Sequence, residues 1–259
     1  MIEQYDGRRN KRQQYAALFA TIAMSMCTTT ACYGERDSPV PPESTVTVTV
    51  TEQAPASPES TPDHGNEIKI STPEVILELG ALAVKQEALK AGYSRAQFDT
   101  EWNRVDGCDI RDIVLIRDLT EEVVDEKCEV QSGKLDDPYT GGHIDFIRGT
   151  GTSGEVPIDH IVALGDAWQK GAQQWKEADR ETFANDTLNL QATSLQANSK
   201  KQDGDFDEWQ PSNGREWCRY VARQIHVKAK YKLWVTNAEH KKMSDTLRTC
   251  PNKEFSIPN

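Results

Sequence analysis

The strongest constraint on the fold is a proline-rich segment from Tyr33 to Ile70, which contains six of the twelve prolines in the chain. Serine, threonine and glutamate are also frequent in this segment. Such a composition buries too little apolar surface to offset the entropy of ordering the backbone. We therefore predict a disordered linker over residues 33–70 and a folded domain over residues 71–259.

The residues before this linker resemble an export signal. Four basic residues between positions 8 and 12 precede a mostly apolar run of thirteen residues, Tyr15–Cys27, which is too short to span a bilayer comfortably. The sequence TTAC resembles a bacterial lipobox, with Thr29 in place of its usual aliphatic residue and Cys32 as the lipid acceptor. We predict a signal peptide over residues 1–32. The exported chain is then either extracellular or lipid-anchored on the outer face of the cell membrane, and an uncleaved anchor is the alternative.

Four cysteines lie in the predicted domain, at positions 108, 128, 218 and 250. An even number of cysteines in an exported chain predicts a disulfide framework. Three pairings are possible, and we favour Cys108–Cys128 with Cys218–Cys250 because each pair brackets one compact segment. A zinc site of four cysteines is the alternative, but the spacings of 20 and 32 residues contain no C-x-x-C pair.

The chain is acidic, with a formal net charge of -11, which by itself disfavours a nucleic-acid ligand. The charge is unevenly distributed: residues 74–159 contain 9 basic and 19 acidic residues, whereas residues 212–253 contain 10 basic and 3 acidic residues. A basic lobe can still bind a polyanion, although solvated helix surfaces explain the same composition. In this basic segment we expect Arg219, Arg223 and Lys230 on the outward face of a helix.

Hydrophobic periodicity predicts an α+β domain in which mostly helices surround one small antiparallel strand pair. The paired strands are expected at Val156–Val162 and Leu188–Ala192. A further strand is expected at His143–Ile147, and Asp109–Leu119 fits either a strand or a helix. The predicted helices are Thr72 to Gly92, Arg95–Trp102, Ala163–Gln174, Asp179–Asp186, Leu195–Asp203, Arg215–Val235 and Ala238–Leu247.

Four polar residues fall on the predicted strand pair and the helix after it. Asp159 and His160 are adjacent on the first strand, and Asn189 and Asn198 follow on the second strand and the next helix. Phosphodiester hydrolysis needs an activated water and charge neutralisation, which a histidine and one divalent cation can supply. Because side chains alternate along a strand, a kink or bulge is needed for Asp159 and His160 to face one site.

From about Gly92 to Cys250, the chain resembles secreted bacterial HNH nucleases of the ββα-metal class. The nearest branch is similar to the C-terminal domain of GmrSD-type restriction enzymes. The resemblance implies a ββα-metal (HNH) core embedded in a mostly helical domain. The chain departs from the family at Gln202, where the family usually has glycine, and at Ala163, where relatives often have proline. The similar blocks are GYSRAQFDTEW, GCDIRDIVLIRDL, IDHIVALGDAWQKGAQQW, FANDTLNLQATSLQANSKKQD and EWQP.

The resemblance also implies roles for the four polar residues. His160 is expected as the general base and Asp159 as a metal ligand. Asn189 is expected as the middle catalytic residue, which fixes the loop or the ring of the histidine. Asn198 is expected as a second metal ligand in place of a third histidine. Carboxylate and amide oxygens suit a hard cation, so we expect one Mg²⁺ ion, with Mn²⁺ as the alternative.

Two basic residues in the similar blocks are expected at the substrate. Lys201 is in the family's Lys-Gly-Asp tail, and the resemblance implies that it contacts phosphate. Arg111, in the block GCDIRD, either holds a phosphate or braces the metal site. An ion pair packed beside the Cys108 disulfide is the structural alternative for Arg111.

Together these expectations describe an exported, metal-dependent HNH endonuclease that hydrolyses phosphodiester bonds. We expect little sequence preference because no base-reading module is recognisable, and we favour DNA over RNA as substrate. No protein partner is evident, and membrane contact is expected only through a lipid anchor. One alternative is a non-catalytic envelope lipoprotein or binding protein on the same scaffold. Another is an antibacterial toxin nuclease, which would normally carry a delivery module.

Overall fold

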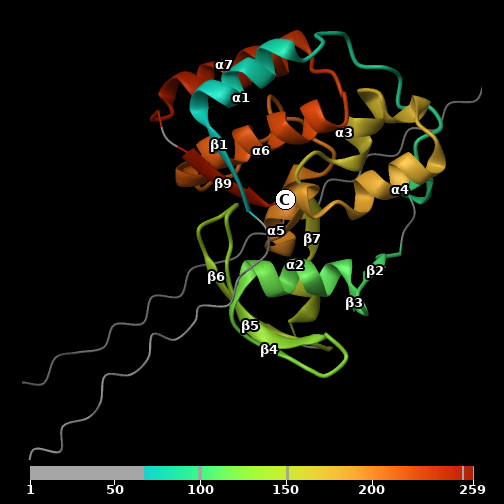
Figure 1. Cartoon of the computed structure of the whole chain (residues 1–259), viewed down its shortest axis with the longest axis vertical. Helices are drawn as coiled ribbons and strands as arrows, with labels where there is room; N and C mark the ends of the chain where they lie inside the picture. The colour runs from blue at the N-terminus through green and yellow to red at the C-terminus, as the bar shows by residue number, and fades with distance from the viewer. Residues whose placement is uncertain (1–66, 99–100, 150–151, 253, 259) are drawn as a thin grey trace, which may run out of the picture. The chain divides into compact units, whose positions relative to one another are not determined.

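In a computed structural model of the chain, the structure describes residues 67–98, 101–149, 152–252 and 254–258 (Figure 1). The predicted signal peptide, Cys32 and nearly all of the predicted linker lie outside the described residues. The described residues form an α+β fold that belongs to one unit of the chain. None of the described helices has the length and apolar character needed to cross a bilayer.

One part of the fold is a helical layer closed by a two-stranded sheet. Helix α1 (Thr72–Ala81) packs against α6 (Trp217–Lys230) and α7 (Asn237–Thr249), as Figure 1 shows. Strand β1 (Glu67–Ser71) pairs antiparallel with β9 (Glu254–Pro258), which brings the two ends of the described chain together. The boundary expected at residue 71 therefore cuts off β1 from the rest of the domain.

A second part combines a three-stranded antiparallel sheet with α2 (Ile110–Asp118). The sheet has the order β4-β5-β6, and its apolar side packs with α2 in a hydrophobic cluster separate from that of the helical layer. A short hairpin precedes α2. The strands of this part are β2 (Arg104–Val105), β3 (Cys108–Asp109), β4 (Leu119–Val124), β5 (Val130–Asp136) and β6 (His143–Ile147).

A short strand pair joins the two hydrophobic clusters. Strand β7 (Ile158–His160) pairs antiparallel with β8 (Leu190–Ala192), and α5 (Leu195–Lys201) follows β8, so the chain has a strand–strand–helix order here. Ile158 and Leu190 belong to the cluster around α2, whereas Ile161 and Leu188 belong to the helical cluster. The polar residues on β7 therefore lie where the two cores meet.

Several shorter elements connect these parts. Two α-helices lie between β7 and β8 in the chain, and single 3₁₀ turns precede or follow them. The α-helices are α3 (Leu164–Gln169) and α4 (Glu177–Asn185), and the 3₁₀ turns are η1 (Arg95–Phe98), η2 (Ser153–Glu155), η3 (Ala172–Gln174), η4 (Thr187–Asn189) and η5 (Gly214–Glu216).

Both predicted disulfides are confirmed. Cys108–Cys128 links β3 to the turn between β4 and β5, with Cα atoms 5.2 Å apart. Cys218–Cys250 links the start of α6 to the residue that ends α7, with Cα atoms 5.7 Å apart. Each bridge closes one of the two parts of the fold, so neither the alternative pairings nor a four-cysteine zinc site is formed.

The helix predicted from Thr72 to Gly92 is too long. It begins as expected, with a capping box between Ser71 and Glu74, but it ends at Ala81. The next residues are held by tertiary backbone hydrogen bonds: Val235 N donates to Ala83 O at 3.0 Å, and Ala88 N donates to Gln169 O at 2.9 Å. The apolar residues that suggested a longer helix, such as Leu82 and Ala83, therefore lie in a non-helical segment that is hydrogen-bonded to the helical layer.

Other differences have similar causes. Of the helix expected at Arg95–Trp102, the described residues form the single turn η1. The ambiguous segment Asp109–Leu119 is mostly the helix α2. The prediction of one strand pair missed the pairs β1–β9 and β4–β5. The β4 sequence LTEEVV has little apolar alternation. The β1 and β9 sequences do alternate, but they are short and pair across opposite ends of the described chain. Arg223, expected on an outward face, is buried and donates to the carbonyls of Leu188 and Leu190.

Candidate active site

Three of the four polar residues singled out in the sequence line one cavity of about 210 Å³, which we call the His160 cavity. Asp159 and His160 come from β7, and Asn198 comes from α5. The strand pair and the helix after it thus bring together residues that are far apart in the chain. The remaining lining residues are Tyr93, Arg95, Ile158, Ala163, Leu164, Gln202 and Asp203.

Asp159 is a buried carboxylate with two positioning partners. Its Oδ2 accepts a hydrogen bond of 2.7 Å from the Tyr139 hydroxyl, and the Lys201 Nζ lies 3.1 Å from Oδ1 and 3.0 Å from Oδ2. Burial and the Asp159 charge raise the pKa of Tyr139 well above its usual value, so the phenol stays protonated as a donor. Each carboxylate oxygen has two acceptor positions. Oδ2 has both Tyr139 and Lys201 as partners, whereas Oδ1 has Lys201 as its partner among the described residues, so one position on Oδ1 remains for a further ligand.

His160 is buried, with 4 % of its surface exposed. Its Nε2 lies 2.9 Å from the carbonyl oxygen of Ala184, and because a carbonyl only accepts, Nε2 carries the proton and Nδ1 has a free lone pair. The Trp102 ring stacks on the imidazole, with centroids 6.2 Å apart. Burial, with smaller contributions from the charges of Arg95 and Lys201, lowers the pKa of His160 to about 3. The imidazole is therefore neutral at physiological pH.

Asn189 does not line the cavity but holds the loop after β7. Its side-chain Oδ1 accepts from Val162 N at 2.8 Å, and its Nδ2 donates to Val162 O at 3.2 Å. Its backbone carbonyl also accepts from Ile161 N at 2.7 Å. Asn189 is fully buried, so these bonds fix the direction in which the chain leaves His160.

The bulge expected on the first strand is absent. Asp159 pairs with Gln191 and His160 with Leu190 in an uninterrupted register. The two side chains form their hydrogen bonds with different neighbours, Asp159 with Tyr139 and Lys201 and His160 with Ala184. Both residues nevertheless reach the cavity, because it is lined by three consecutive residues of β7 rather than by one face of the strand.

The structure corrects the role expected for Lys201. Its side chain is fully buried, and its ammonium contacts Asp159 and donates to the His160 carbonyl at 2.7 Å. Since a buried ammonium needs these partners, it is not available to an incoming phosphate. Lys201 is thus a positioning residue that ties α5 to β7.

Arg111 also lies outside the cavity. Its guanidinium donates to the carbonyl oxygens of Val156 at 3.0 Å and Ser153 at 3.3 Å. These carbonyls belong to the segment that leads into β7, so Arg111 braces the backbone before Asp159. Among the described residues it forms no ion pair with a carboxylate, so the structural alternative for Arg111 is not the arrangement found.

Gln202 has a backbone conformation that normally favours glycine. It follows α5 directly and has a φ of 51° and a ψ of -126°. A side chain in such a region is strained, which gives a physical reason for the glycine that relatives usually have here. Gln202 and Asp203 line both the His160 cavity and a neighbouring cavity of about 350 Å³.

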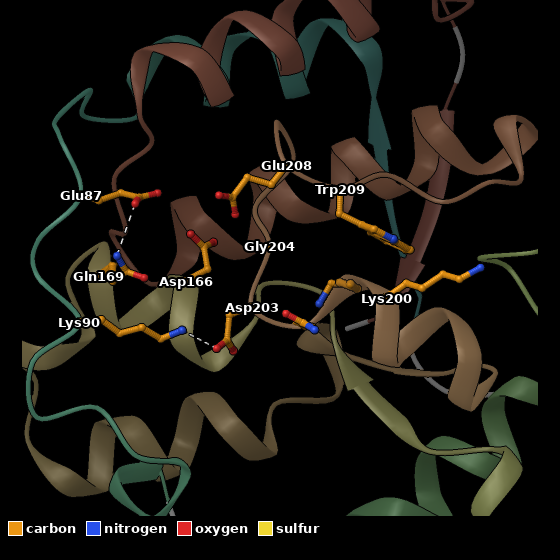
Figure 2. A pocket seen from close by; sticks show the side chains of 11 residues that line it. Glu87, Lys90, Asp166, Gln169, Lys200, Asp203, Gly204, Glu208 and Trp209 are labelled. Carbon is orange, nitrogen blue, oxygen red and sulfur yellow. Dashed lines mark hydrogen bonds and ion pairs between the residues drawn. The ribbon is translucent and has the colours of Figure 1, made fainter. Parts of the chain in front are cut away.

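This second cavity is lined by both carboxylates and lysines. Figure 2 shows the carboxylates of Glu87, Asp166 and Glu208 facing one another across it, with Lys90 bound to Asp203 at 2.6 Å. The Asp203 carboxylate lies so close to α3 that a side-chain carbon at Gly165 would overlap it. A larger residue at position 165 would therefore have to displace the Asp203 side chain.

A buried cluster of charges adjoins this second cavity and shares Asp166 and Glu87 with it. Lys170 Nζ is 2.6 Å from both Asp166 and Asp205 and 2.8 Å from Glu239, and Lys228 bridges Asp166 and Glu239 at 2.7 Å each. Among the described residues, Glu87, Asp166 and Asp205 are close enough together to hold a metal ion. The Lys170 ammonium contacts all three of these carboxylates, so we interpret the cluster as structural.

Sequence reasoning missed four residues at the site: Tyr93, Arg95, Trp102 and Tyr139. Tyr93 and Arg95 line the cavity, Trp102 stacks on His160, and Tyr139 binds Asp159. The first three lie in the block GYSRAQFDTEW, so the family resemblance contained a signal for them. Tyr139 lies in none of the similar blocks, and only its contact with Asp159 reveals it.

The family model for GmrSD restriction endonucleases, C-terminal domain, matches residues 89–246, which include every residue that lines the His160 cavity. The chain belongs to this family. An uncharacterized secreted protein of the fungus Arthroderma benhamiae is 36% identical to this GmrSD C-terminal domain protein over 198 residues, 75% of this chain and 93% of the relative. Because this relative is fungal, it does not support the bacterial origin that the resemblance suggested. No solved structure matches the chain.

Proposed function

We propose that this GmrSD C-terminal domain protein is an exported, metal-dependent endonuclease of the HNH type that hydrolyses phosphodiester bonds in DNA with little sequence preference. One observation carries the proposal: Asp159, His160 and Asn198 line a single cavity at the end of a strand–strand–helix unit. The family match supports nuclease chemistry independently of this geometry.

His160 is the general base in this proposal. Its ring is held by the Ala184 carbonyl and by Trp102, and the lone pair on Nδ1 is available to take a proton from water. Because the imidazole is neutral at physiological pH, no proton has to leave it before it can act. Asn189 contributes by fixing the loop after β7, and Lys201 contributes by holding the His160 carbonyl.

Asp159 and Asn198 are the proposed metal ligands. Their carboxylate and amide oxygens are the donors that Mg²⁺ prefers, and Mn²⁺ accepts the same set. Asp159 keeps an acceptor position on Oδ1, and Asn198 is partly exposed in the cavity, so the residues fit a hard divalent cation. When bound, such a cation neutralises charge on the phosphate and on the leaving oxygen.

Export is supported by two further observations. The fungal relative carries the description of a secreted protein, and both confirmed disulfides suit an oxidising compartment. With the apolar run Tyr15–Cys27 in the sequence, these support a chain that leaves the cell. We propose release, or retention through a lipid on Cys32 at the outer face of the membrane.

The test is plasmid nicking by the purified, oxidised protein with Mg²⁺ or Mn²⁺, with EDTA, and with His160→Ala. We expect cleavage that needs the metal and falls at least about a hundredfold in the variant, because a positioned general base contributes about that much. His143→Ala is the matched control, since His143 is exposed on β6 and does not line the cavity. No cleavage of DNA or RNA with any divalent metal would favour the non-catalytic binding protein.

A further inference from the structure

Arg95 is the one permanently cationic side chain among the residues that line the His160 cavity. It also lines a smaller adjoining cavity with Glu101, Trp102 and His160. The Arg95 side chain is exposed, in contrast to the buried Lys201. A substrate phosphate that approaches His160 therefore meets the guanidinium of Arg95 first among the charged donors of this cavity.

In the His160 cavity itself, Arg95 has no acidic partner among the described lining residues. Asp159 is paired with Lys201 at 3.0 Å, and Asp203 is paired with Lys90 at 2.6 Å. Both acidic side chains of the cavity are thus neutralised by lysines. The remaining formal charge among the lining residues is the positive charge of Arg95, which suits an anion.

The guanidinium of Arg95 also has its donors free. Arg111, Arg117, Arg180 and Arg223 all donate to backbone carbonyls, and other arginines pair with carboxylates. Within the part of the chain that the structure describes, the Arg95 side chain has no hydrogen bond or ion pair. Its five N–H donors are available for a ligand.

The backbone that carries Arg95 is firmly anchored. Phe98, at the end of η1, is fully buried and packs against Trp168 and Phe183 at centroid distances of 6.3 and 6.1 Å. The Arg180 Nε donates to the Gln97 carbonyl at 2.7 Å. Because the backbone is already fixed, the ordering cost of binding a ligand is confined to the Arg95 side chain.

We propose that Arg95 contacts the substrate phosphate, the role that the sequence suggested for Lys201. The proposal rests on the proposed nuclease function. A guanidinium binds two non-bridging phosphate oxygens with two parallel N–H donors, which orients the phosphodiester as well as attracting it. Arg95 approaches from η1 and the proposed metal ligands lie on β7 and α5, so these elements together surround the scissile group.

The test measures binding of a fluorescein-labelled DNA duplex in a His160→Ala background, where the duplex stays intact, at several salt concentrations with Mg²⁺. Arg95→Gln should weaken binding about tenfold, the usual effect of losing a charge-assisted contact. It should also reduce the slope of log affinity against log salt by about 0.9, the value for one phosphate contact. Arg95→Lys should keep the wild-type salt slope and bind more tightly than Arg95→Gln, because lysine keeps the positive charge but lacks the paired N–H donors of the guanidinium.

Arg215→Gln is the matched control, because Arg215 is also exposed, has no side-chain partner within the described residues and does not line the cavity. The control makes the same change in net charge and should leave the salt slope unchanged. Equal effects of the two glutamine variants, or an unchanged slope for Arg95→Gln, would overturn the role of Arg95 alone. If the parent protein neither binds nor cleaves DNA or RNA, the nuclease function fails, and the role of Arg95 fails with it.

Discussion

At the residue scale, the buried imidazole of His160 links the site to the stability of the fold. The pKa of His160 is lowered to about 3 in the folded protein, and an unfolded histidine titrates at about 6.5. Between these values the unfolded chain binds more protons than the folded one. The contribution of the buried, neutral His160 to the free energy of unfolding is therefore present above the unfolded pKa and is lost as the pH falls from about 6.5 toward 3.

This linkage gives a prediction for acid stability. Between pH 6 and pH 4, the free energy of unfolding of the wild type should fall more steeply than that of His160→Gln, by about 1.4 kcal/mol per pH unit at most. Urea unfolding at several pH values measures both slopes, and the comparison removes the titration that the two proteins share. Parallel slopes would show that His160 is not buried as a neutral group.

Also at the residue scale, burial determines which groups the Lys201 ammonium can contact. On a sequence, a lysine near a proposed phosphate site suggests a phosphate contact. In the fold, its ammonium is enclosed by Asp159 and the His160 carbonyl, so its charge is already neutralised. Arg95, which spacing did not single out, has no side-chain hydrogen bond or ion pair within the described residues.

At the element scale, each disulfide fastens a helix of one part of the fold. Cys218–Cys250 joins the start of α6 to the end of α7, and Cys108–Cys128 joins the strand before α2 to the β4–β5 turn. We expect removal of either bridge to lower the free energy of unfolding by roughly 3–4 kcal/mol, largely through a less constrained unfolded chain.

This prediction is checked with Cys218→Ser/Cys250→Ser and Cys108→Ser/Cys128→Ser, each compared with the oxidised wild type in urea. The reduced wild type should resemble the sum of the two double variants, because the bridges close different hydrophobic clusters. Reductant that leaves the unfolding midpoint unchanged would contradict a stabilising role for both bridges.

At the scale of the whole molecule, the β1–β9 pair joins the two ends of the described chain. Ile70 on β1 is 4 % exposed and belongs to the helical core. A chain that begins at Ser71 lacks this residue, and we expect it to be less stable than the full chain by at least about 1.5–3 kcal/mol, the value of one large buried side chain. A chain that begins at Glu67 retains β1 and is the control.

Urea unfolding of the three chains tests this expectation, and equal midpoints for the chains starting at Ser71 and Glu67 would contradict it. The same comparison bears on the proposed site, because β9 and α1 both pack in the core that supports β7. Losing β1 should therefore reduce nuclease activity only as far as it unfolds the domain.

Local chemistry made part of the fold and site predictable. The capping box of Ser71 and Glu74 marks the start of α1, and the alternation around β6 and β8 marks those strands. Cysteine count and spacing favoured the pairing that the structure contains. These features depend on neighbouring residues or on one short closure, so a sequence pattern represents them directly.

The remaining features depend on contacts between distant segments. Backbone pairing with Val235 ends α1 early, because those hydrogen bonds satisfy the groups that a longer helix would have used. Lys201 is buried in the fold and paired with Asp159. Arg95 lines the cavity and has no side-chain partner among the described residues. The sequence by itself determined which chemical groups this protein carries and the family to which it belongs. Only the tertiary structure decided which charges are neutralised inside the core and which are free for a ligand, because desolvation and pairing depend on neighbours that are distant in the chain.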